Sequence, residues 1–206
     1  KQGRGGTGSN GTNLLEDDYV NQLFIGSTKE HLLFITNIGK AYWVKIHEIP
    51  EAEKTSRGAH IKGLLQVGPD EEITAIVSLM NFSDDLYIFM TTSNGVVKKV
   101  RSSEFARAKT RGIIGIKLND GDKLISAIAT KGDSDIMLIS RRGKGLRFKD
   151  SSVRSMGRAS CGIKGMKLAE GDEIAAAVKV EDDTSMILMT EKGYGKKISF
   201  DHYSAH

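Results

Sequence analysis

The cations of this chain recur at matching places along the sequence, and their type and spacing carry its clearest chemistry. Lys and Arg gather in the segments that follow four Ser/Thr-x-x-Gly motifs and in the segments before a later Gly. Cations repeated at equivalent positions of an array form a basic band, which is the electrostatic footprint of a phosphate backbone. The pattern therefore predicts phosphate binding.

The distribution of charge is more informative than its sum. The formal net charge is only +4 and the sequence pI is about 9.0. Acidic residues concentrate at connections into or out of a module's first strand, in residues 16–18, 70–72, 120, 122 and 181–183. If the modules surround an axis, the basic band is separated from acidic faces.

The modules are defined by the motif glycines Gly39, Gly95, Gly143 and Gly193, which are spaced 56, 48 and 50 residues apart. Each Gly lies between a short apolar run and a mixed basic and apolar run. This pattern is typical of a β-hairpin, because Gly takes the positive φ of a tight turn. A period of this length indicates an array of like units.

The similarity of the copies extends beyond the hairpin. Ten residues after each Gly comes one bulky side chain that we expect to plug the end of its module: Ile49, Phe105, Val153 and Tyr203. Strands that start at Ile73, Leu124 and Ile174 are expected to open the following module. Each module then holds about four strands in about 50 residues, the size of one propeller blade.

We therefore expect an all-β, propeller-like disc, with residues 1–206 forming a single domain or part of one. The predicted blades are 19–72, 73–123, 124–173 and 174–206, with the last incomplete and residues 1–18 supplying a closing strand. Two arrangements stay open: the first strand completes the last blade of a closed ring, or the chain is a fragment of a longer array. The fragment is favoured, because four blades is the lower limit for propellers.

Alternation along the strand after each turn predicts which side chains face outward. The fifth residue after the Gly is apolar in every copy and should face the core: Val44, Val100, Phe148 and Ile198. The fourth and sixth residues should face outward: Trp43, Lys99, Arg147 and Lys197, then Lys45, Arg101, Lys149 and Ser199. Lys98 and Lys196, at the third position, break the alternation and indicate a bulge or an exposed strand end. Trp43 either packs on a neighbouring blade, which we favour, or is available to a ligand.

Catalysis has little support in the sequence. The five His residues lack metal-binding spacing, and no nucleotide-binding Gly motif occurs in a strand-to-helix context, so no cofactor and no metal are expected. The single Cys161 excludes an intramolecular disulfide. Without a long apolar run or a signal peptide pattern, the chain is predicted to be cytoplasmic.

Several segments together resemble one known family, the C-terminal domain of the DNA gyrase A subunit. They are EDDYVNQLFIGSTKEHLLFITNIGKAY, GVVKKVRSSEF, RGIIGIKL, SVRSMGRAS, GIKGMKLAEGDE and TEKGYGKKIS, and they cover essentially the whole chain. The resemblance implies a β-pinwheel, in which neighbouring blades exchange strands. It implies a non-catalytic domain that bends and wraps duplex DNA around a basic rim, in the nucleoid, for negative supercoiling. The implied partners are the breakage-reunion domain of the same polypeptide and the ATPase-bearing gyrase B subunit, in an assembly of two A and two B subunits.

The family's seven-residue box, Gln-basic-Arg-Gly-Gly-basic-Gly, aligns with residues 2–8. Gly3 and Thr7 replace its two variable basic positions, and Cys161 stands where the neighbouring copies have Arg57 and Arg111. A degenerate box leaves a second identity open, the C-terminal domain of the A-type subunit of topoisomerase IV, which would bend DNA without strong wrapping.

The candidate DNA-binding residues combine the box with the recurring cations. They are Gln2, Arg4, Lys40, Lys45, Lys98, Lys99, Arg101, Arg107, Lys109, Arg111, Arg141, Arg142, Lys144, Arg147, Lys149, Arg154, Arg158, Lys164, Lys196 and Lys197. A protein-binding propeller is the alternative from another class, but no module carries the Trp-Asp or Gly-His signature of such proteins.

Overall fold

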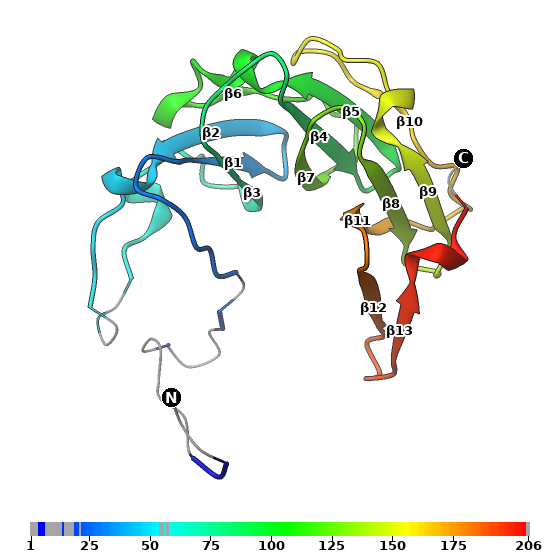
Figure 1. The fold of residues 1–206 in the computed structure, drawn as a ribbon. Coiled ribbons are helices and arrows are strands. Elements are labelled where there is room, and N and C mark those ends of the chain that lie inside the picture. The colour runs from blue at the N-terminus through cyan, green and yellow to red at the C-terminus, as the bar shows by residue number, and fades with distance from the viewer. Residues whose placement is uncertain are drawn as a thin grey trace.

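The structure, a computed structural model, describes residues 4–6, 14, 19–20, 22–53, 56 and 58–204. Within these residues the chain forms antiparallel strands and short 3-10 helices, and it has no α-helix. The predicted all-β fold is confirmed. Four sheets follow one another along an arc (Figure 1), and we number them blades 1 to 4 in chain order.

Each blade is built around one of the predicted hairpins. Blade 1 has the order β3-β1-β2-β6, from Ile73–Leu79, His31–Thr36, Lys40–Lys45 and Ile113–Ile114. Blade 2 has the order β7-β4-β5-β10, from Leu124–Thr130, Tyr87–Thr92, Val96–Arg101 and Ile163–Lys164. Blade 3 has the order β11-β8-β9, from Ile174–Val180, Asp135–Ser140 and Gly145–Lys149. Blade 4 pairs β12 (Ser185–Met189) with β13 (Gly195–Ser199).

Short 3-10 helices follow the hairpins or lie in the connections. They are η1 (Ile46–Glu48), η2 (Ile61–Gly63), η3 (Ser102–Phe105), η4 (Lys109–Arg111), η5 (Asp150–Ser152) and η6 (Phe200–His202). Four of them, η1, η3, η5 and η6, directly follow the second strand of a hairpin. The repeat therefore includes the turn that ends each hairpin.

Neighbouring modules exchange strands. After β5 and its turn, the chain places β6 on β2 of the preceding blade, with Ala41 opposite Ile113. The next module repeats this, since β10 pairs with β5 through Val97 and Ile163. The exchanged strands lie on the outside of the arc, and β3, β7 and β11 lie on its inside (Figure 1).

The strands that begin at Ile73, Leu124 and Ile174 do not open the following module. Each of them, β3, β7 and β11, pairs with the first strand of the preceding hairpin and forms the inner strand of that sheet. The expectation was wrong because chain order and spatial order differ in an exchanged array. The strand that follows an outer strand in sequence, β7 after β6 and β11 after β10, forms the inner edge of the next sheet along the chain.

The motif glycines have the backbone that the turn requires. All four have φ between +79° and +82°. Two of them also make room for the next module: a Cβ at Gly39 would lie 2.5 Å from the Ile116 carbonyl oxygen, and one at Gly95 would lie 2.7 Å from that of Met166. The backbone N–H groups of Gly115 and Ile116 donate to the Gly39 carbonyl at 2.8 and 3.2 Å. The hairpin turn is thus fastened to the exchanged strand.

The hydrophobic core is divided into clusters between and beside the blades. The four predicted plugs, Ile49, Phe105, Val153 and Tyr203, each pack in a different cluster, which confirms their role. Blade 2 has a buried cluster on each face, since Ile88 and Val100 pack toward one side and Phe89 and Val97 toward the other. Stacked sheets of this kind leave no solvated face on a central blade.

Candidate nucleic-acid interface

The fifth residue after each motif glycine faces the core, as the alternation predicts. At the fourth position, three of the four side chains do not face solvent as expected. Val44, Val100 and Phe148 are buried in clusters, and Ile198 is partly buried. At position four, Trp43, Lys99 and Arg147 point toward the following blade rather than into solvent. Each donates a hydrogen bond to a backbone carbonyl of the turn that ends the next hairpin.

The three position-four contacts are equivalent in place but different in chemistry. Trp43 Nε1 donates to the Phe105 carbonyl at 3.1 Å, in η3 of blade 2. Lys99 Nζ donates to the Asp150 carbonyl at 2.7 Å, in η5 of blade 3, and it lies 5.2 Å from the centre of the Tyr87 ring. We call these side chains the position-four latches. The favoured interpretation of Trp43 as a packing residue is confirmed.

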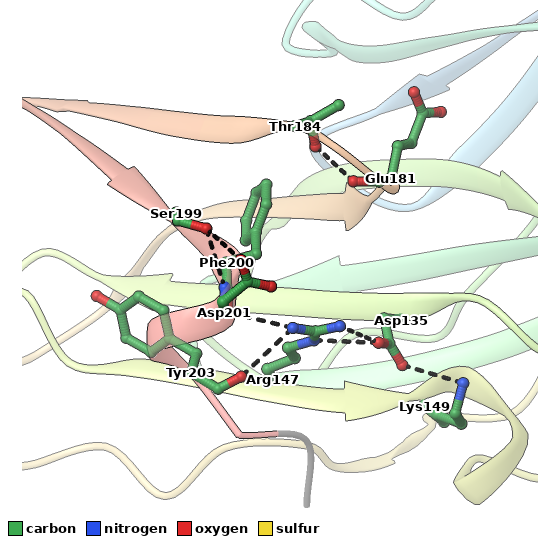
Figure 2. Close-up of polar contacts among 9 residues, drawn as sticks. All are labelled: Asp135, Arg147, Lys149, Glu181, Thr184, Ser199, Phe200, Asp201 and Tyr203. Atoms are coloured by element: carbon green, nitrogen blue, oxygen red, sulfur yellow. Dashed lines mark hydrogen bonds and ion pairs between the residues drawn. The ribbon is translucent and has the colours of Figure 1, made fainter.

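Arg147 is the third latch and the most polar (Figure 2). Its NH1 donates to the carbonyls of Phe200 and Tyr203 at 3.1 and 3.4 Å, across the gap to blade 4. Its Nε donates to Asp135 Oδ2 at 3.0 Å, and Lys149 Nζ lies 3.4 Å from the other carboxylate oxygen. Burial opposes ionisation of Asp135, but Arg147 and Lys149 outweigh it and hold the pKa of the carboxyl below its usual range.

Lys98 corrects a second expectation. Register along β5 is continuous through Lys98 and Lys99, so no bulge is present there. The Lys98 side chain is buried, with 0% exposure, and its Nζ donates to backbone carbonyls that include Gly115 and Ser160. Lys98 and Lys99 are therefore not placed to touch DNA, because both faces of β5 are covered by neighbouring modules.

Lys40 is held by blade 1. Its Nζ lies 2.8 Å from Glu71 Oε1, while the Tyr42 hydroxyl donates to Glu71 Oε2 at 2.8 Å. Burial opposes ionisation of Glu71, but the hydrogen bonds from Lys40 and Tyr42 outweigh it and lower the carboxyl pKa. The hydrogen bond to Glu71 raises the pKa of Lys40. Lys40 thus supports a hairpin rather than presenting a free cation.

Most of the remaining predicted cations are exposed. Two groups lie in the connections that lead to the exchanged strands, residues 106–112 before β6 and residues 154–162 before β10; we call these connections the outer loops. They carry exposed Arg107, Lys109, Arg111 and Arg154, with half-buried Arg158 and, just beyond, exposed Lys164. Figure 1 shows both connections on the outside of the arc.

Other exposed cations lie elsewhere on the blades. Arg101 and Lys149 are exposed at position six, where Lys45 is half-buried. Arg141, Arg142 and Lys144 occupy the β8–β9 turn, where Arg141 pairs with Glu173 at 3.5 Å and Lys144 donates to the Lys167 carbonyl. Lys196 and Lys197 are exposed on β13, and Arg4 is exposed near the N-terminus. Of the box, Gln2, Gly3, Thr7 and Gly8 lie outside the described residues, as does Arg57.

Some of the acidic residues accept hydrogen bonds within the fold and do not contribute to an exposed acidic surface. Asp122 is buried, and its Oδ1 accepts from Ser93 Oγ at 2.9 Å and from the Asn94 N–H at 3.0 Å. Asp172 accepts from the Arg142 N–H at 3.2 Å in the next copy. Glu71, Asp122 and Asp172 each lie two residues before an inner strand. This repetition in the sequence indicates a shared structural role, which the alternation of side chains along the strands does not reveal.

The described residues hold no group of three or more His, Cys, Asp or Glu that could ligate a metal ion. Among them, no helix has the length and apolar character needed to cross a membrane.

Repeated antiparallel sheets, exchanged outer strands and cations on the outer loops define a propeller-like protein of the pinwheel type. The sequence model of one family, described as the DNA gyrase C-terminal domain, beta-propeller, matches residues 1–27, 30–80, 86–131, 134–181 and 184–206. The chain belongs to this family.

Named relatives agree with this membership. The chain is 52% identical to the DNA gyrase A subunit of Treponema pallidum over 159 residues, which cover 77% of the chain and 20% of the relative. It is 42% identical to the Escherichia coli protein of the same name over 156 residues, which cover 76% and 18%. The matched region thus spans about a fifth of the length of these relatives.

Solved structures share the fold. A DNA gyrase A C-terminal domain matches with a TM-score of 0.76 and 30% identity, over 96% of this chain and 66% of that one. The C-terminal domain of a DNA topoisomerase IV matches with a TM-score of 0.79 and 29% identity, over 87% and 56%.

Proposed function

We propose that this chain is a non-catalytic DNA-binding domain of the gyrase A subunit that bends and wraps duplex DNA along its outer loops. The observation that carries the proposal is the recurrence of exposed cations beside both exchanged strands, on the outside of the arc. Family membership supports it, because the relatives are named as the A subunits of DNA gyrases.

Binding of this kind is independent of base sequence. Lys and Arg on loops and strand ends reach phosphates, and the described residues offer no α-helix that could lie in a major groove. Bending 20–30 base pairs by 40–90° costs about 1–6 kcal/mol, so several phosphate contacts must act together. The curvature of the blade array distributes such contacts along a bent path. Deformable DNA is therefore preferred without base contacts.

In the parent enzyme, the wrapped segment would be presented to the breakage-reunion domain for chiral strand passage. The gyrase B subunit would supply ATP hydrolysis in an assembly of two A and two B subunits. The cleavage chemistry would come from the breakage-reunion domain. We place the assembly in the cytoplasm, on the nucleoid.

A second candidate is the C-terminal domain of the A-type subunit of topoisomerase IV, favoured by the structural match at a TM-score of 0.79. The two differ in outcome on closed circular DNA. Removing this domain from a gyrase abolishes negative supercoiling and leaves relaxation, whereas a topoisomerase IV has no negative supercoiling to lose.

The test of DNA binding is charge reversal on the outer loops. The variant carries Arg107→Glu, Lys109→Glu and Arg111→Glu, and the control reverses Lys123 and Lys131, exposed lysines beside the inner strand β7. Each phosphate contact contributes about 0.9 to the slope of log affinity against log salt. We expect the variant to lose up to about 2.7 of that slope, together with DNA bending, and the control to lose neither. A variant that matches the control would exclude this loop from the interface.

A further inference from the structure

Lys98 joins three segments through one buried ammonium group. Its Nζ donates to the Ser160 carbonyl at 2.9 Å and to the Gly115 carbonyl at 3.0 Å, and it also donates to the Arg158 carbonyl. These three acceptors match the three N–H donors of a lysine. The side chain thereby ties β5 and the residue after β6 to the 154–162 outer loop.

The fold itself does not require a cation at this position. The equivalent residue is Tyr42 in blade 1, where its ring covers Gly112, and Leu146 in blade 3. Lys98 likewise lies beside Gly162, since a Cβ there would lie 3.2 Å from the Lys98 Cβ, although the Val97 carbonyl oxygen is nearer at 2.7 Å. Blade 1 has an aromatic and blade 3 an aliphatic side chain at this position, so the charge at Lys98 serves the particular loop that lies against it.

The 154–162 loop has much of its surface in solvent. Arg154, Gly157, Ala159 and Cys161 are all exposed. Arg158 also anchors the loop, since its N–H donates to Glu104 at 3.1 Å and its NH1 donates to the Ile114 carbonyl at 3.1 Å. Two backbone hydrogen bonds add to this, from the Met156 N–H to the Lys99 carbonyl at 2.9 Å and from the Lys117 N–H to the Ser160 carbonyl at 3.0 Å. Lys98 contacts the same loop from its buried side and binds the carbonyls of Arg158 and Ser160. With these contacts Arg154 is exposed and Arg158 is half-buried.

We propose that Lys98 is a positioning residue for DNA binding: it fixes the backbone of the 154–162 loop so that Arg154, Arg158 and Lys164 are presented together to a phosphate backbone. It acts through the loop and makes no contact with DNA. That the loop binds phosphates rests on the proposed function. That Lys98 orders the loop does not depend on it.

The protonation state of Lys98 offers a readout that packing alone would not give. Burial lowers the Lys98 pKa to about 8. The charged and titratable groups that face it are Glu104 from η3 and Arg158 and Cys161 from the loop. Above this pKa the neutral amine has two N–H donors for three carbonyls, so one carbonyl loses its bond to Lys98. The order of the loop should therefore decrease through the mildly alkaline range.

Cys161 allows a direct measurement of that order. It is exposed and is the single Cys of the chain, so a nitroxide attached to its sulfur reports on the loop. The variant is Lys98→Leu, which installs the residue type of blade 3. The matched control is Lys196→Leu, the same position on the exposed strand β13.

We expect the label to be ordered at pH 7 in the wild type and in Lys196→Leu, and mobile in Lys98→Leu. At pH 9 about nine-tenths of a group with a pKa near 8 is deprotonated, so the wild-type label should approach the mobility seen in Lys98→Leu. The Lys98→Leu label should show a flat pH profile. If Lys98→Leu unfolds, as judged by circular dichroism, the wild-type pH profile alone decides.

DNA affinity separates the two halves of the inference. We expect Lys98→Leu to have a shallower salt dependence, by up to about 2.7 in slope for three lost phosphate contacts. A label that stays ordered in Lys98→Leu, or a flat wild-type profile, overturns the positioning role. A mobile label with an unchanged slope confirms the ordering role and overturns the loop's part in DNA binding.

Discussion

The position-four latch between blades 3 and 4 gives the sharpest prediction about how the array is held together. Replacing Arg147 with Met keeps an extended side chain of similar reach and removes every hydrogen bond of the guanidinium. The lost partners are Asp135 in the same blade and the carbonyls of Phe200 and Tyr203 in the next. Blade 4 should then separate from blade 3 more readily.

The expected cost follows from burial. The side chains of Arg147 and Asp135 are 19% and 14% exposed. Breaking a fully buried ion pair costs about 3–5 kcal/mol, because the remaining charge is left without a partner. Lys149 stays 3.4 Å from Asp135 and both groups keep some solvent, so we expect about 2–3 kcal/mol. That energy corresponds to about a 30- to 150-fold larger opening constant.

Amide hydrogen exchange shows which strands lose stability in Arg147→Met. Protection of the amides in β12 and β13 should fall by this factor, while β1 and β2 in blade 1 stay protected, because stability in a repeat array depends on neighbours. The matched control is Lys197→Met, the same position on exposed β13, which should change stability by less than about 0.5 kcal/mol. Adding Asp135→Asn to Arg147→Met should recover part of the loss. Equal exchange in Arg147→Met and Lys197→Met would refute the latch.

Three further predictions concern acidity, a glycine and a plug. The pKa of Asp135 is lowered in the fold, so its contribution to stability is present above the unfolded value near 3.9 and is lost as pH falls through the folded value. Protection of the β12 amides, measured relative to their intrinsic exchange at each pH, should therefore fall below pH 4 in the wild type and much less in Arg147→Met. Gly112→Ala places a Cβ 2.3 Å from the Tyr42 ring at φ +75° and should cost about 2–4 kcal/mol in urea unfolding, whereas Gly121→Ala, at φ +74° with nothing within 4 Å, should cost about 1 kcal/mol. Phe105→Ala removes a fully buried plug and should lower unfolding stability by about 3–5 kcal/mol; a loss below 1 kcal/mol would contradict its place in the core.

The features that depend on local chemistry were predictable from the sequence. Gly at each turn, an apolar fifth residue and a bulky plug follow from backbone freedom and from the need to close each cluster. The hairpins and the all-β class therefore needed no tertiary information. The resemblance to the gyrase domain supplied strand exchange, which the spacing of the copies does not reveal.

Alternation predicted that Lys99 and Arg147 face solvent, and this was wrong, since both point toward the neighbouring blade. A period of two separates the faces of a strand but does not say whether the second face meets water or another sheet. In blade 2 both faces are covered, so long polar side chains end on carbonyls of the neighbouring module. One signal was present in the sequence: Trp43, Lys99 and Arg147 share an N–H donor at the same position, although they share no charge or shape.

Strand exchange has a mechanical consequence. The outer loop 106–112 belongs by sequence to the second module, yet β6, which continues from it, is hydrogen-bonded to β2 of the first sheet. A pull on that loop is therefore resisted by shear between β6 and β2 as well as by the covalent chain from β5. If this loop binds a bent duplex as proposed, the elastic force of the DNA would act on two sheets at each point of attachment. Tension would be shared along the array without being concentrated in one blade.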